Sequence, residues 1–288
     1  MMAPPALLAV GDAKDILARI PTGAVDAIVT SPPYDAVRDY GGNWSIDMPG
    51  LGPEIHRVLK DGGVACVVIG DGTVDGAKTG TTALLTASWI TETPLRLWEH
   101  LIYSRHGRPG AWWSTRFRVD HESILVFVKG KRRAFLDKSH LQEAAKHAGK
   151  SIAGTQRLSD GTTAKIAGER KVAGMKSRGT IWHYASSNAE RNALKSRHPA
   201  TFPDALASDL VRAFVPQGGV VLDPFLGSGT TAVAALRAGR KPIGGDISAE
   251  YMQIARERVR IECAVEVTLM ADGLTWPAEA LDVFGFAA

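Results

Sequence analysis

Cysteine is scarce in this chain, since Cys66 and Cys263 are the two present among 288 residues. Two cysteines form neither a disulfide framework nor a four-ligand zinc site, so we expect both thiols to be reduced core residues and no metal to be bound. The sequence also lacks a run of about 18 apolar residues, the length that a membrane-spanning helix needs. No basic stretch leads into a signal-like apolar segment near the N-terminus. These absences predict a cytoplasmic protein with no membrane segment.

Acidic residues are scarce in one part of the chain. Residues 131–198 carry 15 Lys and Arg but 5 Asp and Glu, a net charge of +10. The whole chain has a net charge of +4, so the remaining residues sum to −6. The same segment is rich in Gly, Ser, Thr and Ala and has little hydrophobic periodicity. This pattern is typical of either a flexible, solvated insertion or a surface that faces phosphate groups.

The hydrophobic pattern predicts an α/β chain. Continuous apolar runs at 64–70 and 124–128 are typical of central parallel strands, and Asp61-Gly62-Gly63 is expected to end the helix before the first run. Residues 265–270 fit either a further strand or an extension. Ser248 is expected to cap the helix that follows it. The other expected strands span 7–10, 24–29, 219–223 and 241–245, and the expected helices span 13–20, 51–59, 204–214, 232–238 and 249–261.

The apolar run 24–29 ends in Thr30-Ser31-Pro32-Pro33-Tyr34. Neither proline has an N–H group to donate, so the strand cannot continue and the chain leaves the sheet with a stiff backbone. Rigid carbonyl groups, the Ser31 hydroxyl and the flat face of Tyr34 together suit a planar ring that carries an amino group, such as a nucleobase. A rigid strand exit without a ligand is the alternative for this segment taken alone.

A Gly-rich turn follows a second predicted strand, at 224–231. Gly227, Gly229 and the first residue of the next helix have G-x-G-x-x-A spacing, which lets a backbone approach a ligand closely at a helix N-terminus. Asp246 ends the strand after that helix and suits a ribose diol, because a carboxylate accepts hydrogen bonds from both hydroxyls.

Asp223 distinguishes two ligands for this turn. A Gly-rich turn also fits an NAD enzyme, but an acid directly before the turn would repel a pyrophosphate. It could instead receive a cationic amino-acid group, which favours S-adenosylmethionine as the cofactor. A crossover turn without a ligand is the structural alternative.

These segments together resemble the β-type DNA amino-methyltransferases, over nearly the whole chain. The catalytic segment precedes the cofactor segment and a basic region lies between them, which is the order that marks the β type. The run from Thr30 to Tyr40 is most similar to solitary or phage-borne members. The motifs that carry the resemblance are Gly11-Asp12, TSPPY at 30–34, RDYGG at 38–42, RVLKDGG at 57–63, His121-Glu122, HPATFP at 198–203 and DPFLGSGTT from Asp223.

The resemblance implies a circularly permuted Rossmann-like fold that uses S-adenosylmethionine and carries a basic target-recognition insertion. We expect a catalytic half at 1–130, a target-recognition region at 131–197 and a cofactor-binding half at 198–288.

The resemblance also assigns roles at the cofactor site. Asp12 is expected at the adenine of S-adenosylmethionine, Asp246 at the ribose and Asp223 at the methionine end, with Phe202 and Pro203 closing the pocket. The full expected set is Asp12, Thr30, Phe202, Pro203, Asp223, Pro224, Phe225, Gly227, Ser228, Gly229, Thr230 and Asp246.

The partner that the resemblance implies is double-stranded DNA, with a homodimer as a further expectation. A base in a duplex must be flipped out to reach an active site. Tyr34 would stack on that base, Pro33 would keep the turn stiff, and Ser31 and the Pro32 carbonyl would accept hydrogen bonds from its amino group. The expected DNA contacts are Arg38, Lys131, Arg132, Arg133, Arg170, Lys171, Lys176 and Arg178.

The identity of residue 31 is a clue to which base is the target. Many adenine-N6 members carry Asp at this position and Ser is more typical of cytosine-N4 members, so we favour cytosine N4 and keep adenine N6 as the alternative. More remote alternatives are a methyltransferase for RNA or protein amides and a DNA-binding protein that has lost catalysis.

Overall fold

The computed structural model describes residues 6–33, 46–106, 117, 119–152, 154–165, 170–185, 194, 203–270 and 284–286. The chain divides into two compact units. The larger unit comprises residues 1–137 and 180–288, and the smaller unit comprises residues 138–179. The smaller unit is shorter at both ends than the region 131–197 expected from the sequence.

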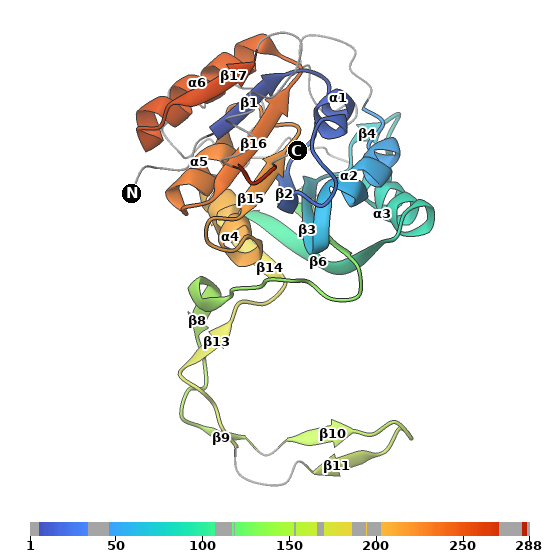
Figure 1. The fold of residues 1–288 in the computed structure, drawn as a ribbon. Coiled ribbons are helices and arrows are strands. Elements are labelled where there is room, and N and C mark those ends of the chain that lie inside the picture. Colours follow the sequence, from blue (N-terminus) through green and yellow to red (C-terminus); the bar gives the residue numbers. More distant parts are fainter. Residues whose placement is uncertain are drawn as a thin grey trace. The chain divides into compact units, whose positions relative to one another are not determined.

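A nine-stranded sheet runs through the described part of the larger unit, in the order β14-β6-β7-β3-β2-β15-β16-β1-β17 (Figure 1). Neighbouring strands are parallel, except that β7 is antiparallel to both β3 and β6. The strands are β1 (Ala6–Val10), β2 (Val25–Thr30), β3 (Leu59–Ile69), β6 (Leu95–His106), β7 (His121–Lys129), β14 (Ile181–Ala185), β15 (Val220–Asp223), β16 (Lys241–Asp246) and β17 (Val267–Met270).

Helices cover both faces of this sheet. The helices α1 (Ala13–Ala18), α2 (Gly52–Val58) and α3 (Thr81–Glu92) share one hydrophobic core with the sheet, and a 3-10 turn at Pro49–Leu51 leads into α2. The helices α5 (Thr230–Arg237) and α6 (Ala249–Cys263) share a second core with it, and α4 (Asp204–Phe214) packs beside α5. The short hairpin β4 (Thr73–Val74) and β5 (Ala77–Lys78) precedes α3.

Strand β1 shows why the sequence needs apolar runs here. Leu7 and Ala9 belong to the core under α1 and α2, whereas Ala6 and Leu8 belong to the core under α5 and α6. Successive side chains of a strand point to opposite faces, so a strand covered on both faces must be apolar at every position.

The structure confirms most of the expected elements. Helix α4 has the expected bounds, and the Ser248 hydroxyl caps α6 by accepting from the Tyr251 N–H at 3.3 Å. The ambiguous segment 265–270 contains strand β17, which pairs in parallel with β1. No strong pattern marked α3, β6 or β14, and the sequence missed all three.

One expectation about a helix end and one about a strand were wrong. Asp61-Gly62-Gly63 does not end a helix, because α2 already stops at Val58 and the three residues bulge out within β3. Gly62 has a φ of +77° there, and its carbonyl accepts from the Ala134 N–H at 2.8 Å. The run 124–128 lies in β7, which is antiparallel, since burial on both faces and not strand direction makes a run apolar.

The smaller unit is built from antiparallel strand pairs. Leu141, in a 3-10 turn at Ser139–Leu141, is the one buried hydrophobic residue among those described in this unit. Backbone pairing therefore supplies most of its order. The pairs are β8 (Gln142–Ala144) with β13 (Met175–Ser177), β9 (Ser151–Ile152) with β12 (Arg170–Lys171), and β10 (Thr155–Arg157) with β11 (Thr163–Lys165).

Within the described ranges, none of the helices has both the length and the apolar character that crossing a membrane requires. Cys66 is a buried free thiol, as expected, whereas Cys263 is a partly exposed free thiol that packs against the edge of the core under α5 and α6.

Candidate functional site

Four parallel strands bring the predicted motifs to one edge of the sheet. β2, β15, β16 and β1 are consecutive neighbours, so their carboxyl ends lie side by side. Ligands of open α/β sheets bind at such an edge. The segments that leave these strands are Ser31-Pro32-Pro33 after β2, the Gly-rich turn after β15, Ile247-Ser248 after β16 and Gly11-Asp12 after β1.

A buried carboxyl group ties two of these segments together. Asp223, which is 1% exposed, accepts from the Thr30 hydroxyl at 2.6 Å through Oδ1 and from the Thr231 hydroxyl at 2.7 Å through Oδ2. Oδ1 also accepts from the N–H of Phe225 at 3.1 Å. The last residue of β2, directly before Ser31, is therefore fixed to the Gly-rich turn and to the first turn of α5. We name this set, Thr30, Asp223 and Thr231, the Asp223 bridge.

Burial and the hydrogen bonds of the bridge act in opposite directions on the pKa of Asp223. Burial raises the pKa of Asp223 to about 6, and the nearby Asp246 adds to that rise, while hydrogen bonds from Thr30, Thr231 and Phe225 hold it down in part. The Thr231 hydroxyl also lies 3.2 Å from the Val29 carbonyl, so its single proton faces two acceptors. The shorter of the two contacts is the one to Asp223, to which the Thr231 hydroxyl donates at 2.7 Å.

Asp246 links the turn to the segment after β16. Its Oδ2 accepts from the N–H of Gly227 at 3.1 Å and its Oδ1 from the N–H of Ser248 at 2.9 Å. Its backbone carbonyl accepts from the N–H of Gly11 at 3.0 Å, which brings Gly11-Asp12 beside it. Burial raises the pKa of Asp246, while these N–H donors lower it. The side chain is partly exposed, so a carboxylate with four lone-pair sites still has capacity for a ligand diol.

The Gly-rich turn needs its glycines. Gly227 has a φ of +52° and Gly229 a φ of +86°, a region that side chains with a Cβ rarely adopt. A Cβ on Gly229 would also lie 3.1 Å from Ala255 of α6. The turn is therefore close-packed from behind, and backbone N–H groups at the start of α5 are available to a ligand. These features fit the adenosyl cofactor that the sequence predicts.

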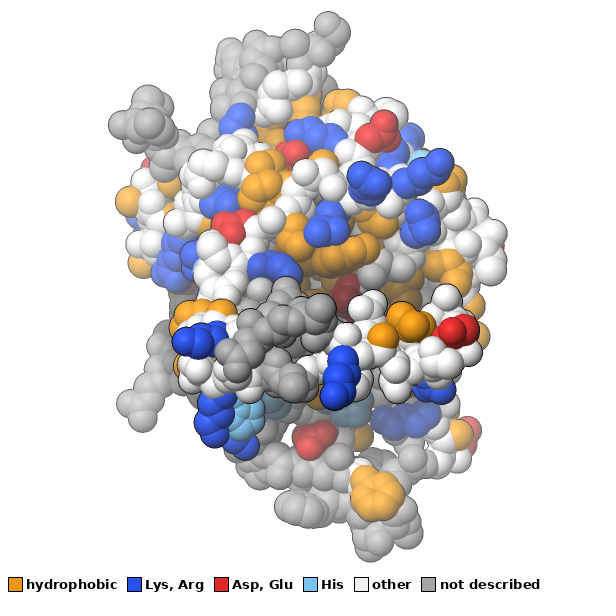
Figure 2. Space-filling view, turned by 90° about the horizontal axis from the view of Figure 1, so that it is seen from below, with side chains coloured by type: hydrophobic (Ala, Val, Ile, Leu, Met, Phe, Trp, Pro, Cys, Tyr) orange, Lys and Arg blue, Asp and Glu red, His pale blue; other side chains and the backbone are white. Residues whose placement is uncertain are grey.

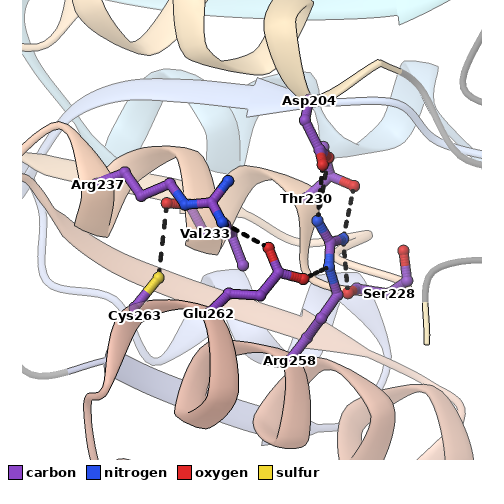
Figure 3. A network of polar contacts seen from close by, with 8 residues as sticks. All are labelled: Asp204, Ser228, Thr230, Val233, Arg237, Arg258, Glu262 and Cys263. Carbon is purple, nitrogen blue, oxygen red and sulfur yellow. Dashed lines mark hydrogen bonds and ion pairs between the residues drawn. The ribbon is translucent and has the colours of Figure 1, made fainter. Parts of the chain in front are cut away.

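Besides Asp223, which is 1% exposed and has both oxygens paired with Thr30 and Thr231, two more side chains expected at the cofactor are buried in the protein. Ser228 is 2% and Thr230 is 3% exposed. The Ser228 carbonyl and the Thr230 hydroxyl each accept from Arg258 of α6 at 3.2 Å (Figure 3). Any cofactor contact of these two residues would therefore come from the backbone.

The structure describes most of the other predicted cofactor residues. Asp12 is exposed and caps α1, with Oδ1 accepting from the Lys14 N–H at 2.8 Å. Pro203 and Pro224 are buried, and Phe225 is partly exposed. Of the predicted catalytic residues, Ser31 and Pro33 are partly exposed and Pro32 is buried directly after β2. Tyr34, Arg38 and Phe202 lie outside the described residues.

The predicted DNA contacts fall in both units. Lys131, Arg132 and Arg133 are exposed in the larger unit, where the Arg133 guanidinium lies 4.7 Å from the centre of the Trp98 ring. In the smaller unit, Lys171 is exposed. Lys176 and Arg178 lie 3.7 and 3.6 Å from Glu143, and Arg170 contributes its backbone to β12. Figure 2 shows a face on which Lys and Arg side chains are widespread and acidic ones are few.

Sequence reasoning missed Thr231, Arg258 and Asp204. Thr231 is the last letter of DPFLGSGTT, so the motif contained it. Arg258 could have been found because it stands on the apolar stripe of α6, between the buried residues Ala255 and Val259, where a charge needs a partner.

We predict that Asp223→Asn preserves the bridge, with the amide donating to Thr231 and its oxygen accepting from Thr30. Asp223→Ala should instead lower the free energy of unfolding by about 2 kcal/mol, because it leaves buried polar groups unpaired.

The raised pKa of Asp223 means that the folded state binds its proton more tightly than the unfolded state does. This carboxyl therefore stabilises the fold at acid pH and loses that contribution as pH rises from about 4 through about 6.

Thermal unfolding from pH 4.5 to 7 measures both effects. The melting temperature of the wild type should fall relative to Asp223→Asn, on the order of 5 °C over that range. A constant difference across the range, or an Asn variant as unstable as the Ala variant, would contradict the bridge.

Comparison with known proteins identifies the family. Residues 25–257 match the N6/N4 methylase family model, described as a DNA methylase. The chain is 32% identical over 238 residues to the orphan methyltransferase M.BamHII of Bacillus amyloliquefaciens, covering 82% of this chain and 89% of that protein.

Solved structures agree with that match. A putative DNA modification methylase from Thermus thermophilus is 27% identical with a TM-score of 0.62, covering 93% of this chain and all of that one (100%). The same protein is solved in complex with S-adenosyl-L-methionine. The PvuII cytosine-N4 DNA methyltransferase shares the fold, with a TM-score of 0.65 at 17% identity over 98% of this chain and 94% of its own. The chain therefore belongs to the N6/N4 DNA methylase family, the S-adenosylmethionine-dependent DNA amino-methyltransferases with a Rossmann-like fold.

Proposed function

We propose that this enzyme methylates the exocyclic amino group of a base flipped out of double-stranded DNA, and that the base is cytosine, modified at N4. The observation that carries the proposal is the Asp223 bridge, because it joins the strand exit with Ser31 and Pro32 to the Gly-rich turn. A base-binding segment and a cofactor-binding segment held by one buried group suit a reaction that depends on the alignment of two ligands.

The residues of this chain supply positioning and electrostatics. The cofactor, when bound, supplies an electrophilic methyl group on a sulfonium sulfur. The Ser31 hydroxyl and the Pro32 carbonyl would accept hydrogen bonds from the amino group, which localises electron density on a nitrogen that is otherwise conjugated with the ring. Tyr34 would stack on the base and Asp246 would bind the cofactor's ribose.

Ser31 supports cytosine N4 over adenine N6. The preference rests on the resemblance, because Ser at this position is more typical of cytosine-N4 members and Asp of adenine-N6 members. The Ser31 hydroxyl and an Asp carboxylate can both accept from an amino group, so adenine N6 is the alternative that a product assay must exclude. We predict that DNA of mixed sequence, methylated by the enzyme and hydrolysed to nucleosides, contains N4-methylcytosine by mass spectrometry. N6-methyladenine would contradict the choice of base but not the reaction class. A methylated ring carbon would contradict the mechanism.

Variants at the two ends of the site should separate its roles. We predict that Ser31→Ala lowers kcat by about 100-fold while the Kd for S-adenosylmethionine changes little, because the hydroxyl acts on the base. Asp246→Ala should mainly weaken cofactor binding, by about tenfold or more, because it loses the diol acceptor and frees the Gly227 N–H.

Calorimetric titration with the cofactor and single-turnover assays measure the two effects. Equal loss of cofactor affinity in both variants would show that Ser31 is misassigned. The same titration of Asp223→Asn tests the expected contact with the methionine end, which would have to reach a carboxyl group that is 1% exposed. A large loss of affinity without a loss of stability supports that contact, and unchanged affinity contradicts it.

The basic residues of the smaller unit support a role in binding the DNA backbone. Lys171 is exposed on β12, whereas the charge of Lys176 lies 3.7 Å from Glu143. We predict that Lys171→Gln weakens binding to all sequences alike and reduces the slope of log K against log salt by about 1. Lys176→Gln is the matched control and should change the slope less. Equal slopes for Lys171→Gln and the wild type would contradict this role.

We also propose that the enzyme works in the cytoplasm, where the DNA of a bacterial cell lies, and as a solitary methyltransferase that forms a homodimer. The DNA substrate supports the location, and an orphan relative supports the solitary role. The homodimer is an expectation from the family resemblance. Sedimentation at micromolar concentration tests the dimer, which a monomer mass would contradict.

A further inference from the structure

Helix α6 carries a fully buried arginine behind the cofactor turn. Arg258 is 0% exposed and lies at the centre of a polar network within the larger unit (Figure 3). A guanidinium stays charged in proteins, so burying one requires that its N–H groups be paired. Its partners therefore define what this side chain holds in place.

The partners come from three segments. Nη2 donates to Oδ1 and Oδ2 of Asp204 at 3.1 and 3.0 Å. Nη1 donates to the Ser228 carbonyl and the Thr230 hydroxyl, both at 3.2 Å. Nε donates to Oε1 of Glu262 at 2.7 Å, one turn further along α6. All the nitrogens of the guanidinium are in use.

Two of these segments are the predicted walls of the cofactor site. Asp204 is the first residue of α4 and directly follows Phe202-Pro203, the pair expected to close the pocket. Ser228 and Thr230 flank Gly229 in the Gly-rich turn. One planar guanidinium group thus joins the start of α4 to the turn.

We propose that Arg258 is a positioning residue for S-adenosylmethionine, which raises cofactor affinity by holding the start of α4 against the Gly-rich turn and does not touch the cofactor. The inference rests on the proposed function only in placing the cofactor at that turn.

Arg237 provides a matched control. It donates to Oε2 of the same Glu262 at 2.9 Å, but it is half exposed and its hydrogen bond reaches neither α4 nor the turn. Arg237→Met therefore removes a cation from the same network without releasing either wall.

The test compares Arg258→Lys, Arg258→Met and Arg237→Met by titration with S-adenosylmethionine in the absence of DNA. Lysine keeps the charge but cannot span Asp204, Ser228 and Glu262 together. Both Arg258 variants should bind the cofactor about tenfold or more weakly, while kcat at saturating cofactor stays within about threefold of the wild type. Arg237→Met should bind as the wild type does.

A purely structural role predicts a different pattern. If Arg258→Lys melts at a lower temperature but binds the cofactor as the wild type does, or if kcat falls with unchanged affinity, the inference is wrong. If Arg258→Met does not fold, Asp204→Asn replaces it. The double variant Asp204→Asn with Arg258→Lys should then lose less cofactor affinity than the product of the losses in the two single variants, because both remove the same contact. A wild type that fails to bind the cofactor would contradict the proposed function instead.

Discussion

The carboxyl group of Asp223 is the contact on which the site depends. It is buried at the end of β15, yet its partners lie on β2 and on α5, so it joins segments that the sequence separates by 193 residues. Carboxyl groups are rarely buried without such partners, and here burial also raises the pKa to about 6. The outcome is a stiff connection between Ser31-Pro32, expected at the base, and the turn expected at the cofactor.

Around this bridge the fold adds further constraints on the same turn. Asp246 holds Gly227 from the neighbouring strand, and Arg258 holds Ser228 and Thr230 from behind. The glycines allow positive φ and close packing against α6. A turn fixed from three sides can present its backbone N–H groups with little reorganisation, which is what preorganised binding of a cofactor requires.

Local patterns in the sequence were enough to predict most strands and the segments that form the site. Each signal is local: Pro32-Pro33 directly follows one apolar run, and the glycines follow Asp223 within a few residues. The site segments and the strands before them were therefore predicted. The Asp223 bridge and the Arg258 contacts are tertiary, and no local pattern tells which hydroxyl meets which carboxyl. Strand direction was also hidden: β7 is as apolar as its parallel neighbours, because burial alone determines that pattern.

The central claim is that the Asp223 bridge aligns the base segment with the cofactor segment. The most direct test is the single-turnover rate of methyl transfer for Thr30→Val, which keeps the shape of the side chain but loses the hydroxyl that donates to Asp223 at 2.6 Å. The rate should fall by about tenfold or more, whereas Thr30→Ser should restore most of it. A Thr30→Val variant that transfers methyl groups as fast as the wild type would contradict the account.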